Sequence, residues 1–325
     1  MLFKKCYFIQ IEKIKKFSIP ICITTNKFNI IGRHIEDKKK FVIPRIKNPV
    51  YLPDGFLLYF TQDNVAHSIC QFIRSFYEYC LLDKKPFIYV SEIILRMPFL
   101  HKLFILLFNT NEYKILNLKQ YYYFENLYIP DYIWFTDGQN FKINYDIENS
   151  VRILDTNIGI TKEYNNLYEA LLLFDKTIDI IFEENKDKYP IYENIILIKS
   201  NLCTDSMTPY RQIFLEPNFN EILYKYNYEM ILPHKINDII NHIVLLKSAK
   251  NIITSYGGAN CVNRFFFNKN SVVKVICNEA YSSEYMDINH NLISSYCTLK
   301  YLYFLNINNS IKNNTIEYII NYKNY

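Results

Sequence analysis

The feature that most constrains the fold is a regular alternation of strand and helix patterns between residues 195 and 277. Residues 195–198 form an unbroken run of Ile and Leu, which is typical of a parallel strand buried on both faces. In chain order the predicted elements are a strand at 195–198, a helix at 218–226, a strand at 228–232, a helix at 235–249 and strands at 251–254 and 271–277. This alternation predicts a doubly wound α/β domain.

The first half of the chain carries two strongly helical segments. Residues 64–80 place apolar side chains at three- and four-residue steps, which predicts an amphipathic helix, and residues 166–184 predict a longer one. The polar stretch 183–193, with Pro190 inside it, is the best linker candidate. At 325 residues the chain has room for two domains. We expect an N-terminal α/β domain over 1–185, a C-terminal Rossmann-like domain over 186–305 and an Asn-rich, partly helical tail over 306–325.

The charge balance and the cysteines narrow the classes of function. The 37 Lys and Arg against 32 Asp and Glu give a net charge of +5, which is too mild to indicate a nucleic-acid partner. No apolar run reaches the roughly 18 residues of a membrane span, and Gln10, Glu12 and Lys13 interrupt any signal-peptide core. The 8 Cys form no CxxC pair and show no zinc-like spacing with the 6 His. We therefore expect a cytoplasmic protein with free thiols, no bound metal, no nucleic-acid partner and no integral membrane segment.

A pair of adjacent glycines marks the first candidate site. Only 6 Gly occur in the chain, and Gly257 and Gly258 stand together between the predicted strand that ends at Thr254 and a predicted helix over 261–267. Ligands bind at such strand-to-helix crossings in α/β folds. Glycine lets the backbone approach a phosphate, and the first N–H groups of a helix point at the anion. Thr254 and Ser255 add hydroxyl donors, so the junction favours a phosphate site over the alternative of a plain tight turn.

Two further sets of polar residues are candidates. Asn64, His67 and Gln71 follow one another at three- and four-residue steps and therefore share a face of the helix predicted over 64–80. This face is opposite the apolar stripe. If it lines a cleft, His67 can orient or deprotonate a hydroxyl; the alternative is a solvated helix face. Lys199 ends the strand at 195–198 and Arg211 follows in the next loop, where cations suit a diphosphate unless they are ordinary exposed loop residues.

Taken together, these motifs resemble glycosyltransferase family 61 over about residues 55–280. The family shows a strand ending in a basic residue, an Arg before a helix, and a turn of the pattern G-A-x-x-x-N-x-x-F after a further strand. The matching segments are IILIKS with Lys199, YRQ with Arg211, and SYGGANCVNRFFF, in which Gly258, Ala259, Asn263 and Phe266 fit the turn. Counting from Ala249 instead gives Gly257 the first glycine place, so both registers stay open. The family's N-x-x-H occurs as Asn64-Val-Ala-His67.

The resemblance implies a GT-B architecture, in which two Rossmann-like domains face each other across a cleft. It implies an inverting, metal-independent transfer of a sugar from a nucleotide-sugar, with a UDP-sugar expected, to a hydroxyl of a glycan. The nucleotide-sugar is a substrate, so no cofactor is implied. The implied catalytic residues are His67, Asn64 and Gln71, and the implied donor-binding residues are Lys199, Arg211, Thr254, Ser255, Tyr256, Gly257, Gly258, Ala259 and Asn263.

Four positions depart from the family pattern. Lys199 replaces the usual Arg and keeps the positive charge, and His242 stands in the place of the usual Gln. Gln71 and Lys274 stand where the family has carboxylates. The loss of these two carboxylates favours the alternative of a non-catalytic, glycosyltransferase-like module that binds sugar or protein. An unrelated Rossmann-type nucleotide-binding enzyme is a further alternative.

Overall fold

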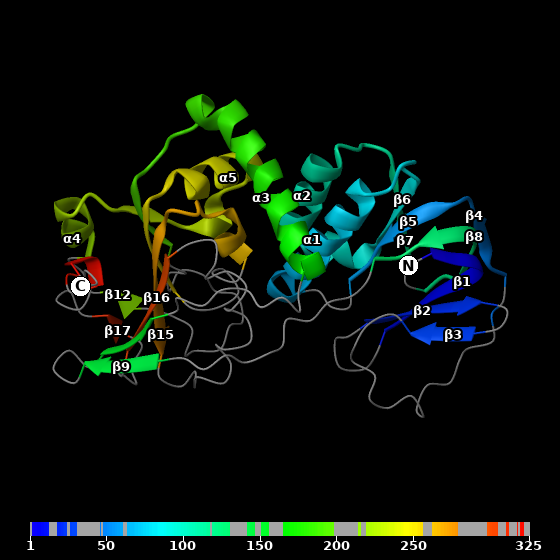
Figure 1. Ribbon diagram of the computed structural model, residues 1–325, viewed down its shortest axis with the longest axis horizontal. Helices are drawn as coiled ribbons and strands as arrows, with labels where there is room; N and C mark the ends of the chain where they lie inside the picture. The colour runs from blue at the N-terminus through cyan, green and yellow to red at the C-terminus, as the bar shows by residue number, and fades with distance from the viewer. Residues whose placement is uncertain are drawn as a thin grey trace. The chain divides into compact units, whose positions relative to one another are not determined.

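The computed structural model describes most of the regular elements of the chain (Figure 1). The described residues are 2–12, 18–24, 27–30, 46, 48–60, 64–117, 119–130, 142–146, 151–155, 165–197, 214–215, 219–255, 262–278, 298–304, 310–311, 317 and 319–321. They belong to two compact units. Unit 1 comprises Met1–Trp134 and Asn165–Phe174, and unit 2 comprises Phe135–Tyr164 and Asp175–Tyr325.

The described part of unit 1 is built on one mixed sheet. Its strands are β1 (Leu2–Glu12), β2 (Ser18–Thr24), β3 (Lys27–Ile30), β4 (Val50–Leu52), β5 (Gly55–Leu58), β6 (Phe87–Ser91), β7 (Tyr113–Leu116) and β8 (Tyr122–Tyr128). They lie in the order β3-β2-β1-β8-β5-β6-β7, with β4 beside β8. The strands β8, β5, β6 and β7 run parallel, whereas β1, β2 and β3 pair antiparallel. Gly55 lies so close to the ring of Tyr89 that a Cβ would overlap it.

Two helices and a short 3₁₀ helix complete the core of unit 1. They are α1 (Val65–Cys80), η2 (Glu92–Arg96) and α2 (Pro98–Phe108). The ring of Phe108 lies edge-on to those of Phe72 and Phe76, 5.9 Å and 5.5 Å between centroids, so α1 and α2 pack through aromatic side chains. The helix predicted over 64–80 is confirmed. Pro98 takes the first position of α2, where its missing N–H leaves no hydrogen bond unmade.

Unit 2 is built on a second sheet with a parallel centre. Its strands are β9 (Lys142–Asp146), β10 (Val151–Asp155), β11 (Asn194–Leu197), β13 (Glu229–Ile231), β14 (Asn251–Ser255), β15 (Val272–Asn278) and β16 (Thr298–Phe304). They lie in the order β13-β11-β14-β15-β16-β10-β9. The first five strands of this order, β13, β11, β14, β15 and β16, run parallel to one another. The α/β class is confirmed, and the parallel strands with their helices are compatible with a Rossmann-like fold.

The connections of unit 2 contain short helices. They are α4 (Phe219–Lys225), η6 (Pro233–Lys235), α5 (Ile239–Ser248) and η7 (Arg264–Phe266), and a small ladder pairs β12 (Phe214–Leu215) with β17 (Ser310–Ile311). The helix predicted over 235–249 begins later than expected. Asp238 caps it by accepting a hydrogen bond from the N–H of Ile240 at 2.9 Å, and Pro233 starts a separate 3₁₀ turn before it.

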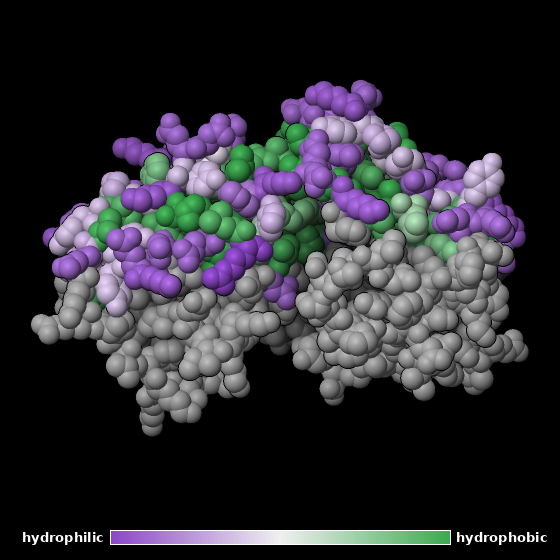
Figure 2. All heavy atoms as spheres, turned by 180° about the vertical axis from the view of Figure 1, so that it is seen from behind, coloured by the Kyte–Doolittle hydropathy of each residue, from purple (hydrophilic) through white to green (hydrophobic). Residues whose placement is uncertain are grey.

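The long helix α3 (Asn165–Asn185) confirms the prediction over 166–184 and contributes residues to both units. It is followed by η4 (Lys186–Lys188), and residues 183–193 are exposed or half-buried. Figure 2 shows hydrophilic side chains over much of the described surface on the face it draws. The domain boundary predicted at residue 185 stays a prediction, because compactness alone does not show which segments fold independently.

Two of the general expectations can be compared with the structure. Cys6 and Cys80 carry free thiols, as expected. No helix within the described ranges is both long and apolar enough to cross a membrane.

Candidate functional site

The order of strands in unit 2 fixes where a ligand site is expected. From β11 the chain passes to β13 on one side, and from β14 it passes to β15 on the other. The strand order therefore reverses between β11 and β14, which are parallel neighbours with their carboxyl ends at the same edge. Ligands of open α/β sheets bind in the crevice outside the carboxyl ends at such a reversal. The predicted donor-binding residues follow these two strands in the sequence.

Three of those residues are described. Thr254 and Ser255 end β14, and Thr254 is buried with 1% of its surface exposed. Asn263 lies just before η7, on the connection that leaves β14, and is 3% exposed. The remaining predicted donor-binding residues lie outside the described residues: Lys199, Arg211, Tyr256, Gly257, Gly258 and Ala259.

Asn263 forms a buried pair with a histidine from α5. The Nε2 atom of His242 lies 2.9 Å from Oδ1 of Asn263, and the ring of Phe266 lies edge-on to the imidazole at 6.1 Å between centroids. Burial lowers the pKa of His242 to about 4, although the hydrogen bond that the imidazole donates to Asn263 opposes this shift. The imidazole is therefore neutral at pH 7. Because Oδ1 only accepts hydrogen bonds, Nε2 is the nitrogen that carries the hydrogen.

The other end of the Asn263 amide is unsatisfied. Its Nδ2 is buried, and it has no hydrogen-bond partner among the residues that the structure describes. A buried donor without a partner costs about 1–3 kcal/mol, so such a group in a native structure calls for a water or a ligand.

The helix predicted over 261–267 is described only from residue 262 onward. Residues 262 and 263 are helical and are followed by the three-residue 3₁₀ helix η7, while residues 256–261 lie outside the described residues. The suggested role of this helix N-terminus in phosphate binding therefore stays a prediction.

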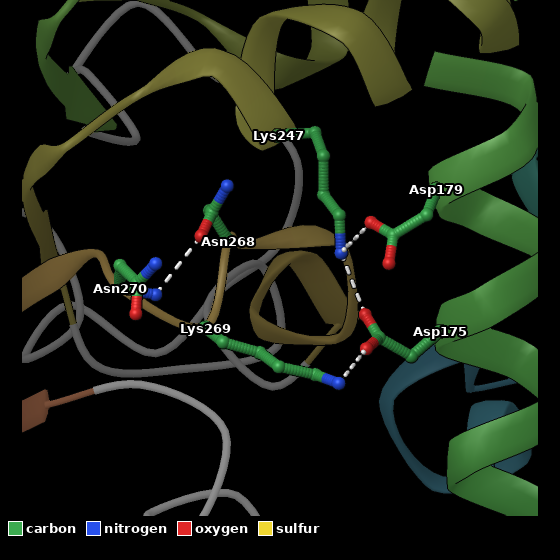
Figure 3. Close-up of polar contacts among 6 residues, drawn as sticks. All are labelled: Asp175, Asp179, Lys247, Asn268, Lys269 and Asn270. Atoms are coloured by element: carbon green, nitrogen blue, oxygen red, sulfur yellow. Dashed lines mark hydrogen bonds and ion pairs between the residues drawn. The ribbon is translucent and has the colours of Figure 1, made fainter. Parts of the chain in front are cut away.

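An ionic cluster joins side chains of α3, α5 and the segment between η7 and β15 (Figure 3). Lys247 of α5, 2% exposed, pairs with Asp175 at 2.6 Å and with Asp179 at 2.8 Å, both on α3. Asp175 also pairs with Lys269 at 2.9 Å. Lys269 lies in the turn after η7, where the side chain of Asn268 accepts the N–H of residue 270. The cluster thus ties α3, α5 and the turn before β15 together. Sequence reasoning missed it, because nothing local pairs Lys247 with acidic residues so far away in the chain.

In unit 1 the predicted catalytic residues begin after the carboxyl end of β5. Asn64 is exposed, and its carbonyl accepts the N–H of Ser68 at 3.0 Å at the start of α1. His67 lies in the first turn of α1, but its side chain lies outside the described part of the structure. Its proposed role therefore stays a prediction.

Three polar side chains of α1 are buried. Gln71, Arg74 and Ser75 are 2%, 7% and 0% exposed, so the alternative of a solvated helix face does not describe these residues. Arg74 pairs with Glu78 at 2.7 Å, and the hydroxyl of Ser75 donates to the carbonyl of Gln71 at 2.8 Å. The Nε2 of Gln71 is buried, and no described residue accepts its hydrogens.

Near its C-terminal end, α1 also contacts α3. The hydroxyl of Tyr77 donates to the carboxylate of Glu169, and this hydrogen bond is the main reason that the pKa of Tyr77 is raised. Both residues belong to unit 1. The residues of α1 belong to unit 1, whereas the residues at the end of β14 belong to unit 2.

Lys274, the second departure from the family pattern, has a structural role. It lies in β15, is 7% exposed, and its Nζ donates to the backbone carbonyls of Ile319 and Ile320 at 2.7 Å and 3.0 Å. The ammonium group of Lys274 is thereby held on backbone oxygens of the C-terminal residues. No group of three or more His, Cys, Asp or Glu in the described ranges is arranged to hold a metal ion.

Comparisons with known proteins add no assignment. A scan of protein-family models found no match to the chain, and a search of curated proteins found no matching sequence. The residues at the carboxyl ends of β11, β14 and β5, together with the resemblance of their motifs, therefore remain the basis for a function.

Proposed function

We propose that the chain is a glycosyltransferase that moves a sugar from a nucleotide-sugar to a hydroxyl group of a glycan. One observation carries the proposal. The strand order of unit 2 reverses between β11 and β14, and the residues that the resemblance assigns to the donor follow these two strands. Two units, each with its own α/β sheet, are compatible with the GT-B architecture that the resemblance implies.

The donor diphosphate would be held at the reversal of unit 2. Lys199 and Arg211 supply positive charge to the departing phosphates, and the glycine turn at 257–258 lets the backbone approach them. The hydroxyl of Thr254 and the amide of Asn263 add hydrogen-bonding groups beside the turn. Fixed donors of this kind stabilise the charge that develops on the leaving group without needing a metal.

The acceptor would be activated from unit 1. The imidazole of His67 takes the proton of the acceptor hydroxyl while the hydroxyl oxygen bonds to the anomeric carbon. The bond between that carbon and the phosphate oxygen breaks, and the nucleoside diphosphate leaves from the opposite side, which inverts the configuration. Asn64, three residues earlier, would fix the imidazole by a hydrogen bond, and Gln71 lies four residues further along the sequence.

A second candidate function is a non-catalytic, glycosyltransferase-like module that binds a sugar or a protein. The observation that favours it concerns Gln71 and Lys274. The first is an amide and the second uses its amine on backbone carbonyls, so neither position offers a carboxylate.

A panel of UDP-, GDP- and CMP-sugars separates the two functions. The purified protein is titrated with each sugar by calorimetry, and nucleotide release is then measured with glycan acceptors. We expect a UDP-sugar to bind and turn over, and His67→Ala to lower turnover by about 10²–10⁴-fold with donor affinity kept. His101→Ala is the matched control, because His101 of α2 bonds Tyr113 and has no proposed part in the reaction. Binding without turnover supports the second function, and binding of no nucleotide-sugar overturns the proposed glycosyltransferase.

A further inference from the structure

We propose that His242 is a positioning residue, which holds the amide of Asn263 so that Nδ2 donates a hydrogen bond to a diphosphate oxygen of the nucleotide-sugar. This inference rests on the proposed function and deepens it. It assigns to the site a residue from α5, the helix before β14, and gives the direction of the hydrogen bond that the ligand receives.

The first step is the orientation of the amide. A neutral imidazole has one N–H, and the 2.9 Å contact places it on Nε2, facing Oδ1 of Asn263. The carbonyl end of the amide is thereby occupied by His242. Both side chains are more than nine-tenths buried, and the ring of Phe266 packs against the imidazole. The planar amide then has one remaining direction for Nδ2, away from α5.

The second step is the partner of Nδ2. This nitrogen is buried and finds no acceptor among the described residues. Asn263 lies on the connection that leaves β14, at the reversal of strand order where ligands of α/β sheets bind. The group must be an acceptor, because an amide N–H only donates. A diphosphate presents more acceptor oxygens than any other part of a nucleotide-sugar, and an anionic acceptor makes the stronger hydrogen bond.

The third step separates positioning from simple packing. Since His242 is neutral, it contributes the direction of the amide and adds no charge to the site. A Gln at this position keeps an N–H for Oδ1, whereas a Leu fills similar space without one. If His242 acts by positioning, His242→Gln retains ligand affinity and His242→Leu does not. If it acts only by packing, both variants lose or keep affinity together.

The test uses UDP and uridine as probes and measures their affinities by calorimetry. We expect Asn263→Asp, which replaces the donor by an anion in the same shape, to weaken UDP at least tenfold and to leave uridine unchanged. We expect His242→Leu to weaken UDP about tenfold and His242→Gln to bind UDP within about twofold of wild type. Asn251→Asp is the matched control. Its amide donates to Asn194 at 2.7 Å at the amino end of β14, so the same charge is added away from the site.

A second measurement needs no ligand and no variant. Nitrogen NMR of the imidazole distinguishes its two neutral tautomers, and we expect the hydrogen on Nε2 at pH 7. A hydrogen on Nδ1 would reverse the amide and overturn the inference. If Asn263→Asp binds UDP as tightly as the wild-type protein does, the inference about His242 and Asn263 is overturned as well, while the proposed function survives. If the wild-type protein binds no nucleotide, the proposed function has failed, and the inference fails with it.

Discussion

The helices α1 and α5 both bury polar side chains, but they satisfy them differently. In α5 the buried His242 and Lys247 reach side chains on other segments, Asn263 and Asp175. In α1 the buried Arg74 pairs with Glu78 and Ser75 bonds a carbonyl of its own helix. The difference teaches that burial alone does not define a site. A polar contact between segments fixes those segments, whereas a contact within one helix fixes only that helix.

The largest effect is expected for Lys247→Met, which tests whether the buried contacts of α5 with other segments stabilise the fold. Breaking a buried ion pair leaves Asp175 buried with half of its charge partners, so we expect the free energy of unfolding to fall by about 4 kcal/mol. Urea denaturation measures this change. The control is Lys250→Met, which removes an exposed pair with Glu193 and should cost about 0–1 kcal/mol. Equal losses in the two variants would show that the cluster does not fix α5.

The second test uses the pKa of His242, which burial lowers from 6.5 to about 4. Below pH 6.5 the imidazole is protonated in the unfolded chain, whereas in the folded chain it stays neutral until about pH 4. Stability is therefore present at neutral pH and is lost as the pH falls through this window, by about 3 kcal/mol in total. Thermal unfolding of wild type and His242→Gln at pH 4.5 and 7 checks it. The variant should lose less stability, and parallel losses would contradict the buried neutral imidazole.

Lys274→Met extends the comparison to a buried residue that binds backbone. We expect a loss of about 2 kcal/mol, because two carbonyls near residue 320 lose their donor and the amine's place is only partly filled. The control is Lys225→Met, whose exposed pair with Glu317 involves the same C-terminal turn. Its loss should stay below about 1 kcal/mol. A larger loss in the control than in Lys274→Met would assign the docking of this turn to the exposed pair.

The smallest expected effect is at Gln71. Its buried Nε2 has no acceptor among the described residues, so Gln71→Leu should raise stability by about 1 kcal/mol if the amide has no ligand. Ser75→Ala is the companion, since it removes the hydroxyl that donates to the carbonyl of Gln71 and should cost about 1 kcal/mol. A gain in stability joined to weaker binding of a glycan would give Gln71 a binding role and make α1 resemble α5.

The elements were predictable because their patterns are local. The run at 195–198 and the helical repeats at 64–80 follow from which side chains suit a strand or a helix, and β11 and α1 form there. The strand order was not predictable, because it depends on pairings between distant segments. It is the strand order that places Thr254 and Asn263 at a reversal of the sheet.

Burial was the least predictable property of the polar residues. The spacing of Gln71 placed it opposite the apolar stripe, but whether that face meets water depends on the elements that cover it. The same holds for Lys247, whose acidic partners lie about 70 residues earlier in the chain. A signal was present at Asn263, which the motif singled out, and its partner His242 was noted only as a departure from a pattern.

The contact between Lys274 and the carbonyls of Ile319 and Ile320 makes these residues important for stability, although their composition does not indicate it. A stop codon in place of residue 317 would remove only residues 317–325 and yet leave an ammonium group in the centre of a parallel sheet with those acceptors gone. Such a shortened product should be cleared by cellular proteases faster than the small number of removed residues suggests.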